Sequence, residues 1–144
     1  MTEDLVLTKF GQWLSNGEPI THAGTVALFF RILQRDEDGY FLEIGREHKR
    51  VEVEDTPQFV VRILGDLDRS PELEFSDGAV GALDPARLRY SHSLQRLIIH
   101  RAKDGIVARF LHAPYHEILQ RAEPQGDGYA LRVGERLHAL ALEA

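Results

Sequence analysis

Cysteine is absent from the 144 residues, which excludes disulfides, thiolate chemistry and every cysteine-ligated zinc or iron–sulfur site. The absence fits a reducing cytoplasm. Long apolar runs are missing too, since no stretch approaches the roughly 20 apolar residues that a membrane-spanning helix needs. The acidic opening, MTEDLVLTKF, lacks the apolar centre of a secretory signal. We therefore expect a cytoplasmic protein with no membrane partner.

Several catalytic signatures are also absent. The sequence contains no GxSxG, no GxGxxG, no GxxxxGK[ST] and no HExxH, which removes the usual patterns of serine hydrolases, dinucleotide-binding proteins, P-loop proteins and zinc proteases. The net charge of −6 argues against binding duplex nucleic acid, which needs a basic face. We expect no cofactor, and a non-enzymatic role more than an enzymatic one.

The composition that is present is globular, with 43% hydrophobic and 28% charged residues. The chain divides into a lead-in (1–20), a first α+β half (21–66) and a second α+β half (67–144), because the polar, turn-rich GDLDRSP stretch favours a boundary there. In the lead-in, Phe10, Trp13 and Leu14 have helical spacing and predict a short helix that docks on the core.

The first half opens with THAGTVALFFRILQR, which predicts an amphipathic helix. Val26, Phe29, Phe30 and Leu33 follow the i, i+3, i+4, i+7 rule, and Thr21 is the expected N-cap. YFLEIG and RVEVED then predict a hairpin, and FVVRIL predicts a buried strand.

The stretch VEVEDTP (51–57) ends the hairpin and holds three acidic residues. Strand alternation places Glu52 and Glu54 on the solvent face, which we favour over a metal or proton-transfer site. Asp55 differs, because an aspartate in a turn usually accepts the N–H two residues on, and Pro57 has none. The Asp55 carboxylate must therefore bond something else, so we take it as a candidate ligand-binding residue.

The second half predicts strands at ELEF, ARLRY, LQRLIIHR and GIVARFL, a helix over APYHEILQRA and a final hairpin turning about Gly134. Pro114 suits the first helical position, and Pro124 is expected to stop the helix. Each half thus combines one amphipathic helix with several antiparallel strands. The order of elements favours a duplication, and the fold class is α+β with mostly antiparallel sheet.

Two further candidates lie where the GIVARFL strand meets this helix. Arg109 precedes a helix N-terminus and could hold a carboxylate or phosphate, although an internal salt bridge is the favoured alternative. His112 and His116 are four residues apart, as in two-histidine metal sites on a helix. We expect His112 to lie outside the helix, however, and find no third ligand. His112, His116 and nearby acids would form the site in the alternative of a small metal-dependent hydrolase.

One long run, PITHAGTVALFFRILQRDEDGYFLEIGREHKRVEVEDTPQFVV, resembles the opening half of the bacterial domain-of-unknown-function family numbered 1285. Its matching phrases are Leu28-Phe29, Ile32-Leu33, Asp38-Gly39-Tyr40 and Val51–Pro57, while Gln58 interrupts the family pattern before Phe59. The segment GIVARFLHAPYHEIL is also similar, through Ala108, Arg109, Tyr115 and Leu119.

The resemblance implies two small α+β halves packed as one unit, the second superficially like a pleckstrin-homology fold. It also implies a signalling or regulatory role and a ligand cleft between the halves. We expect a small anionic or nucleotide-like ligand there, with Asp55 orienting a donor, Arg109 pairing with the anionic group and Tyr115 stacking or hydrogen-bonding. A third alternative is a protein-interaction module that forms a homodimer through a sheet edge.

Overall fold

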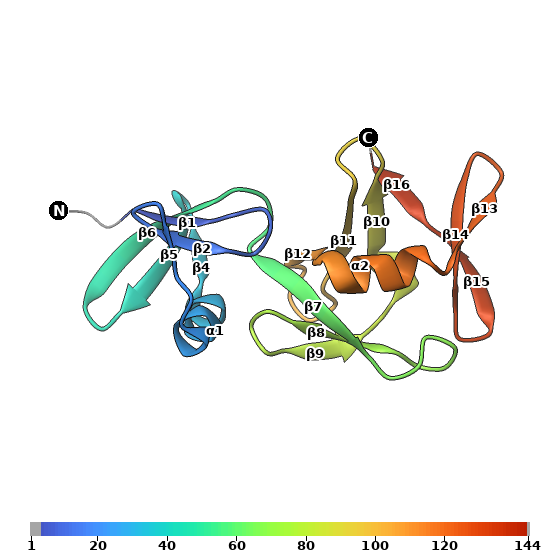
Figure 1. Cartoon of the computed structure of the whole chain (residues 1–144), viewed down its shortest axis with the longest axis horizontal. Coiled ribbons are helices and arrows are strands. Elements are labelled where there is room, and N and C mark those ends of the chain that lie inside the picture. The colour runs from blue at the N-terminus through green and yellow to red at the C-terminus, as the bar shows by residue number, and fades with distance from the viewer. Residues whose placement is uncertain (1–3, 144) are drawn as a thin grey trace. The chain divides into compact units, whose positions relative to one another are not determined.

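The computed structural model describes residues 4–143, which form two compact units (Figure 1). Unit 1 contains the residues up to Gln58 together with Ser76–Gly78, and unit 2 contains Phe59–Phe75 and the residues from Ala79 onward. The main boundary therefore falls at Gln58–Phe59, at the start of a strand, and differs from the predicted one between 66 and 67. Within residues 4–143, no helix is long and apolar enough to cross a membrane.

Unit 1 combines a six-stranded sheet with one helix, α1 (Ala23–Ile32). The strands stand in the order β3-β2-β1-β6-β5-β4, with bounds β1 (Leu5–Leu7), β2 (Trp13–Ser15), β3 (Glu18–Pro19), β4 (Gln34–Asp36), β5 (Gly39–Ile44) and β6 (Glu47–Val53). Neighbouring strands are antiparallel except for β1 and β6, which run parallel. The predicted hairpin over YFLEIG and RVEVED is confirmed as β5 and β6.

The predicted helix over residues 10–14 is wrong, because that segment contributes the strand β2. A hairpin turn follows at once, where Asn16 and Gly17 both have positive φ angles, of 50° and 84°. Asn-Gly is the preferred pair for such turns, and it joins β2 to β3 in antiparallel register. Turn chemistry therefore overrides the helical spacing of the lead-in. These residues belong to the unit 1 sheet and are not a separate lead-in.

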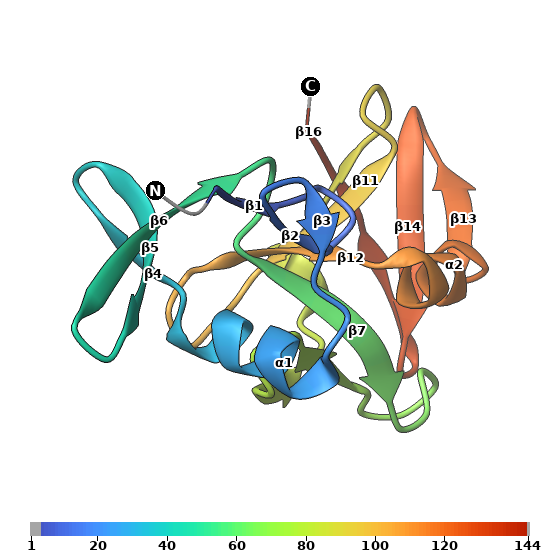
Figure 2. The same ribbon diagram turned by 60° about the vertical axis from the view of Figure 1, so that its left-hand side comes forward.

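The predicted helix of the first half is confirmed as α1, but its cap is not Thr21. His22 occupies the N-cap position, and its Nδ1 accepts the backbone N–H of Thr25 at 3.1 Å. The short strand β3 leads directly into this helix (Figure 2). The helix is shorter than its apolar pattern suggests, because Gln34 already starts β4.

Aromatic side chains dominate the buried interior of unit 1. Trp13, the only tryptophan in the sequence, is fully buried, and its ring meets those of Phe29 and Phe30 edge to face, at centroid distances of 5.3 and 5.5 Å. Such edge-on pairs stabilise a core beyond the burial of their area. The buried apolar face of α1 thus packs onto β2.

Unit 2 contains the second helix, α2 (His112–Leu119), and two sheets. The larger sheet has the order β16-β10-β11-β12-β7-β8-β9, with bounds β7 (Gln58–Leu64), β8 (Glu72–Phe75), β9 (Val80–Ala82), β10 (Leu88–Ser91), β11 (Arg96–His100), β12 (Val107–Phe110) and β16 (Ala141–Glu143). The smaller one contains β13 (Ala122–Gln125), β14 (Gly128–Val133) and β15 (Arg136–Ala139). A 3-10 turn, η1 (Pro85–Arg87), precedes β10.

A contiguous apolar cluster fills unit 2. It includes Leu88, Leu97 and Ala108 from the large sheet, Ile118 from α2 and Leu131 from the small sheet, each at most 2% exposed. Both sheets and the helix therefore share one core. The α+β class with mostly antiparallel sheet is confirmed.

The ends of α2 differ from the prediction. The helix begins at His112, so Pro114 is its third residue and not its first. Proline is tolerated there because the first-turn N–H groups have no partner within a helix. At the other end the helix stops at Leu119, and Pro124 lies inside the edge strand β13, where a missing N–H costs little.

Candidate functional site

Two tyrosines of unit 2 face each other between a strand and a helix. Tyr90 comes from β10 and Tyr115 from α2, and the Tyr115 hydroxyl donates to the Tyr90 hydroxyl at 3.3 Å. Their ring centroids are 6.4 Å apart, and both rings pack against the apolar core of the unit. The arrangement presents phenolic oxygens at the border between an apolar interior and the surface.

Burial raises the pKa of Tyr115 from 10.0 to about 12, and the hydrogen bond to Tyr90 adds to the increase. The positive charge of Arg109 acts in the opposite direction and is the weakest of these influences. Arg109 and Tyr115 are thus within electrostatic reach of each other. At neutral pH the phenol is fully protonated, so it can donate a hydrogen bond but is poorly suited to removing a proton.

Arg109 occupies its predicted position on β12. Its neighbours Ala108 and Phe110 are buried in the core, while Arg109 is half-buried on the opposite face, as strand alternation predicts. The register places it directly across from Ile98 on β11. Arg109 already has an interaction within the chain, and a bound anion would be additional to it.

The VEVEDTP stretch is the solvent-facing end of β6 and the bend that follows it. Glu52 and Glu54 are exposed and Val51 is buried, which confirms the structural interpretation of the two glutamates. Glu54 Oε1 accepts the backbone N–H of Lys9 at 3.2 Å, so this acid ties β6 to the loop after β1. Asp55 is half-buried in unit 1 and has an interaction partner. Its role in ligand binding stays a prediction.

The two histidines of α2 lie on one face of the helix. The expectation that His112 lies outside the helix is wrong, and the ring centroids of His112 and His116 are 4.3 Å apart. Both side chains are exposed. Among the residues that the structure describes, no group of three or more His, Cys, Asp or Glu side chains could hold a metal ion. A zinc centre uses three or four protein ligands, and this pair supplies two.

Gln58 is a buried polar residue whose structural role the sequence pattern does not indicate. Its Nε2 donates to the carbonyl of Phe30 at 2.8 Å, its Oε1 accepts from the Ser76 hydroxyl at 2.5 Å, and its own carbonyl accepts from Thr56 Oγ1. The side chain is 3% exposed. It therefore joins three separate segments of unit 1, and the interruption that Gln58 makes in the family pattern is a structural tie.

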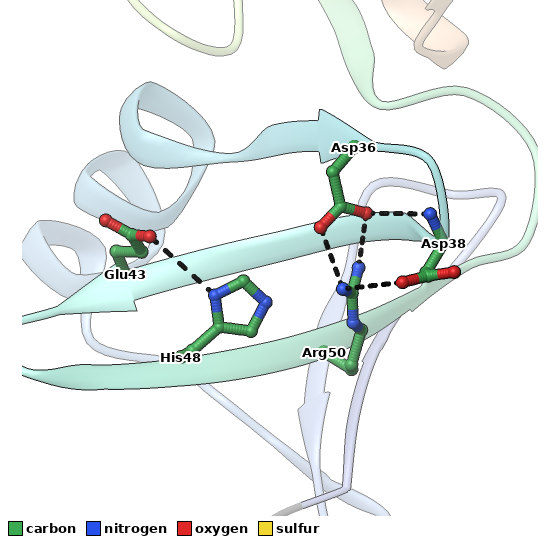
Figure 3. Close-up of polar contacts among 5 residues, drawn as sticks. All are labelled: Asp36, Asp38, Glu43, His48 and Arg50. Atoms are coloured by element: carbon green, nitrogen blue, oxygen red, sulfur yellow. Dashed lines mark hydrogen bonds and ion pairs between the residues drawn. The ribbon is translucent and has the colours of Figure 1, made fainter.

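A second polar network lies on the hairpins of unit 1. Arg50 on β6 reaches across β5 to Asp36 on β4 with two hydrogen bonds of 2.7 and 2.8 Å, and Asp38 lies 3.7 Å from the same guanidinium (Figure 3). This hydrogen-bonded pair lowers the pKa of Asp36 from 3.8 to about 2. Both partners are solvent-exposed, and each satisfies the hydrogen bonds of the other. The network is therefore interpreted as a structural link across the three strands β4, β5 and β6.

Comparison with protein families gives one match. Residues 2–56 match the N-terminal domain of the domain of unknown function DUF1285. A search of curated proteins found no match. The resemblance of the first half to this family is thereby confirmed.

Two solved structures resemble the chain in fold. A DUF1285 family protein from Silicibacter pomeroyi DSS-3 is 20% identical with a TM-score of 0.69, and the match covers 97% of this chain and 80% of that one. A DUF1285 family protein from Shewanella baltica OS155 is 22% identical with a TM-score of 0.61, covering 82% of this chain and 91% of that one. At these identities the likeness shows the fold alone.

Proposed function

We propose that this chain is a non-enzymatic, cytoplasmic protein that binds a small anionic ligand and acts in regulation. The observation that carries the proposal is that the charge of Arg109 acts on Tyr115, whose hydroxyl is hydrogen-bonded to that of Tyr90. A guanidinium supplies a permanent charge and paired donors for a carboxylate or phosphate. The neutral phenol adds a directional donor without adding negative charge.

The properties of Tyr115 favour binding over catalysis. A general base works best when its pKa lies near the operating pH, and that of Tyr115 is about 12. The ring is also half-buried against the core, which fixes its orientation at little entropic cost on binding. We therefore assign Arg109 to pair with the anionic group of the ligand. Tyr115 would hydrogen-bond to the ligand or stack against it.

Asp55 is the third proposed ligand residue, as an acceptor for a donor on the ligand. It belongs to unit 1, whereas Arg109 and Tyr115 belong to unit 2. Its role is therefore tested by its own variant, Asp55→Asn, which keeps the size of the side chain and removes its charge.

A thermal-shift series tests the proposal. Inorganic phosphate, citrate and adenosine monophosphate each supply an anionic group, and a ligand at a hundred times its dissociation constant adds about 2.7 kcal/mol to the free energy of unfolding. We expect at least one of them to raise the melting temperature, and Arg109→Gln to remove the rise. Arg132→Gln is the matched control, because Arg132 is an exposed arginine of the same unit that pairs with Glu123. An unchanged rise in Arg109→Gln would refute the site.

A further inference from the structure

A pocket of unit 2 lies at the β8–β9 hairpin and the turn that follows β11. Its volume is about 280 Å³, and Phe75, Val80 and Ile99 contribute apolar surface to its lining. Ligand pockets usually have volumes of about 300–1,000 Å³. This pocket therefore fits a compact ligand. It shares no lining residue with the Arg109–Tyr115 site.

The residues in the apolar part of the pocket are not explained by strand packing alone. Val80 lines the pocket and is 51% exposed, although β9 is an edge strand where a charged residue would protect against unwanted pairing. Gly81 beside it has no side chain, and a Cβ there would meet only the Phe75 ring, at 3.9 Å. The space above Phe75 is thus kept open by a glycine and bordered by a valine.

The polar part of the pocket is cationic. Its lining includes Arg87, Arg101 and Lys103, against one lining carboxylate, Asp84. Arg87 pairs with Asp84 at 3.5 Å, and Arg101 pairs with Asp104, which lies outside the lining. Three cations minus these two carboxylates leave one net positive charge, and Lys103 carries it at the exposed rim. The pocket is therefore locally positive, although the formal charge of the whole chain is −6.

The Arg101 side chain holds a fixed position in the cationic part of the pocket. Its side chain is 5% exposed, its Nε and Nη2 donate to both oxygens of Asp104 at 3.2 and 2.7 Å, and its guanidinium lies 5.1 Å from the centroid of the Phe75 ring. A guanidinium held between a carboxylate and an aromatic face does not reorient when a ligand enters. Arg101 therefore connects the apolar part of the pocket with its charged rim.

From this lining we infer that the pocket binds a small monocarboxylic acid with a compact aromatic or branched apolar body. The body lies against Phe75, Val80 and Ile99, and the carboxylate lies at the rim beside Lys103. A single net positive charge favours a monoanion over a multiply charged phosphate, because a second negative charge would be desolvated without a partner. This site is additional to the one proposed around Arg109.

Benzoate is the probe. Two related compounds separate the contribution of its ring from that of its carboxylate. Benzamide keeps the ring without the charge, and acetate keeps the charge without the ring. We expect benzoate to saturate with a dissociation constant on the order of 1 mM or tighter, and each of the other two to bind at least about tenfold more weakly. Backbone amide shifts in nuclear magnetic resonance spectra of the full chain locate the site, with the largest changes expected at Gly81, Ala82 and Lys103.

Two variants test the assignment of the two parts. Gly81→Val fills the apolar space, and Lys103→Gln removes the net charge, so each is expected to weaken benzoate binding about tenfold or more. Lys9→Gln in unit 1 and Arg132→Gln in unit 2 are controls that should leave benzoate binding at this pocket unchanged, since neither residue lines it. Equal affinity for benzoate and benzamide, amide shifts confined to other residues, no saturation, or full binding by Gly81→Val would each overturn the inference. This test depends on Gly81 and Lys103, whereas the thermal-shift test depends on Arg109, so failure at one site is distinguishable from failure at the other.

Discussion

Tyr115 of α2 and Tyr90 of β10 share a hydrogen bond of 3.3 Å between their hydroxyls. The bond links the helix to the large sheet of unit 2 at a point where both rings touch the apolar core. Burial acts on the Tyr115 hydroxyl more strongly than any charge nearby, which is why its pKa rises although Arg109 opposes the rise. The same hydroxyl therefore stabilises the unit and offers a donor to a ligand.

Tyr115 should titrate later than an ordinary tyrosine. Its pKa in the folded protein is about 12 instead of 10.0. The neutral phenol therefore makes its full contribution to the stability of the fold below pH 10, and this contribution is lost as the pH rises through about 12. Ultraviolet absorbance of phenolate, followed against pH, should show one late step among the four tyrosines. Tyr115→Phe should remove that step.

The control for this titration is Tyr129→Phe. Tyr129 lies on β14 in the same unit and is 43% exposed, so its loss should leave the late step in place. If the late step survives in Tyr115→Phe, the assignment of the raised pKa to this residue is wrong.

Arg50 should control the acidity of Asp36. The two hydrogen bonds from its guanidinium lower the pKa of that carboxyl from 3.8 to about 2, so Arg50→Gln should return it toward 3.8, as measured by nuclear magnetic resonance titration of the side chain. Because the folded pKa is lowered, the pair stabilises the fold above pH 4, and this contribution disappears as the pH falls through about 2. Arg35→Gln is the control, since Arg35 adjoins Asp36 in sequence but lies over the Tyr40 ring.

Elements with strong local patterns were predicted best. The α1 stripe, the β5–β6 hairpin and the hairpin about Gly134 all combine a clear apolar period with matching turn residues. The helix predicted over residues 10–14 is wrong because the helical spacing of Phe10, Trp13 and Leu14 covers a single turn, and the Asn16-Gly17 hairpin turn overrides it. The boundary between the units was misplaced because a polar loop looks like a linker even where it joins β7 to β8 within one sheet.

The candidate site could be predicted only in part. Strand alternation placed Arg109 correctly, but nothing local in the sequence pairs Tyr90 with Tyr115, because the two residues meet through the packing of α2 on the sheet. The role of Gln58 could not be predicted for a similar reason, since the two partners of its side chain, Phe30 and Ser76, lie 28 and 18 residues away in the chain. Such residues are recognised from contacts and not from spacing.

Gln58 should be a sensitive position for the stability of unit 1. Gln58→Leu keeps the approximate volume but removes the hydrogen bonds to the Phe30 carbonyl and the Ser76 hydroxyl. A hydrogen bond contributes about 0.5–1.5 kcal/mol net, so for these two bonds we expect a loss of about 1–3 kcal/mol in chemical denaturation followed by Trp13 fluorescence. Gln12→Leu at an exposed position should change the midpoint little. A neutral effect of Gln58→Leu would mean that water replaces these bonds freely.

Gly134 should tolerate a side chain less well than Gly126, although both have positive φ angles, of 64° and 59°. The left-handed conformation costs a non-glycine residue about 1–2 kcal/mol, so both alanine variants should lower the melting temperature. At Gly134 the added Cβ would also lie 3.1 Å from the Arg69 carbonyl oxygen, which cannot move freely because the Gly134 N–H is bonded to the neighbouring Leu67 carbonyl at 2.8 Å. Gly134→Ala should therefore lower the melting temperature more than Gly126→Ala, and equal effects in calorimetry would show that the Arg69 loop yields.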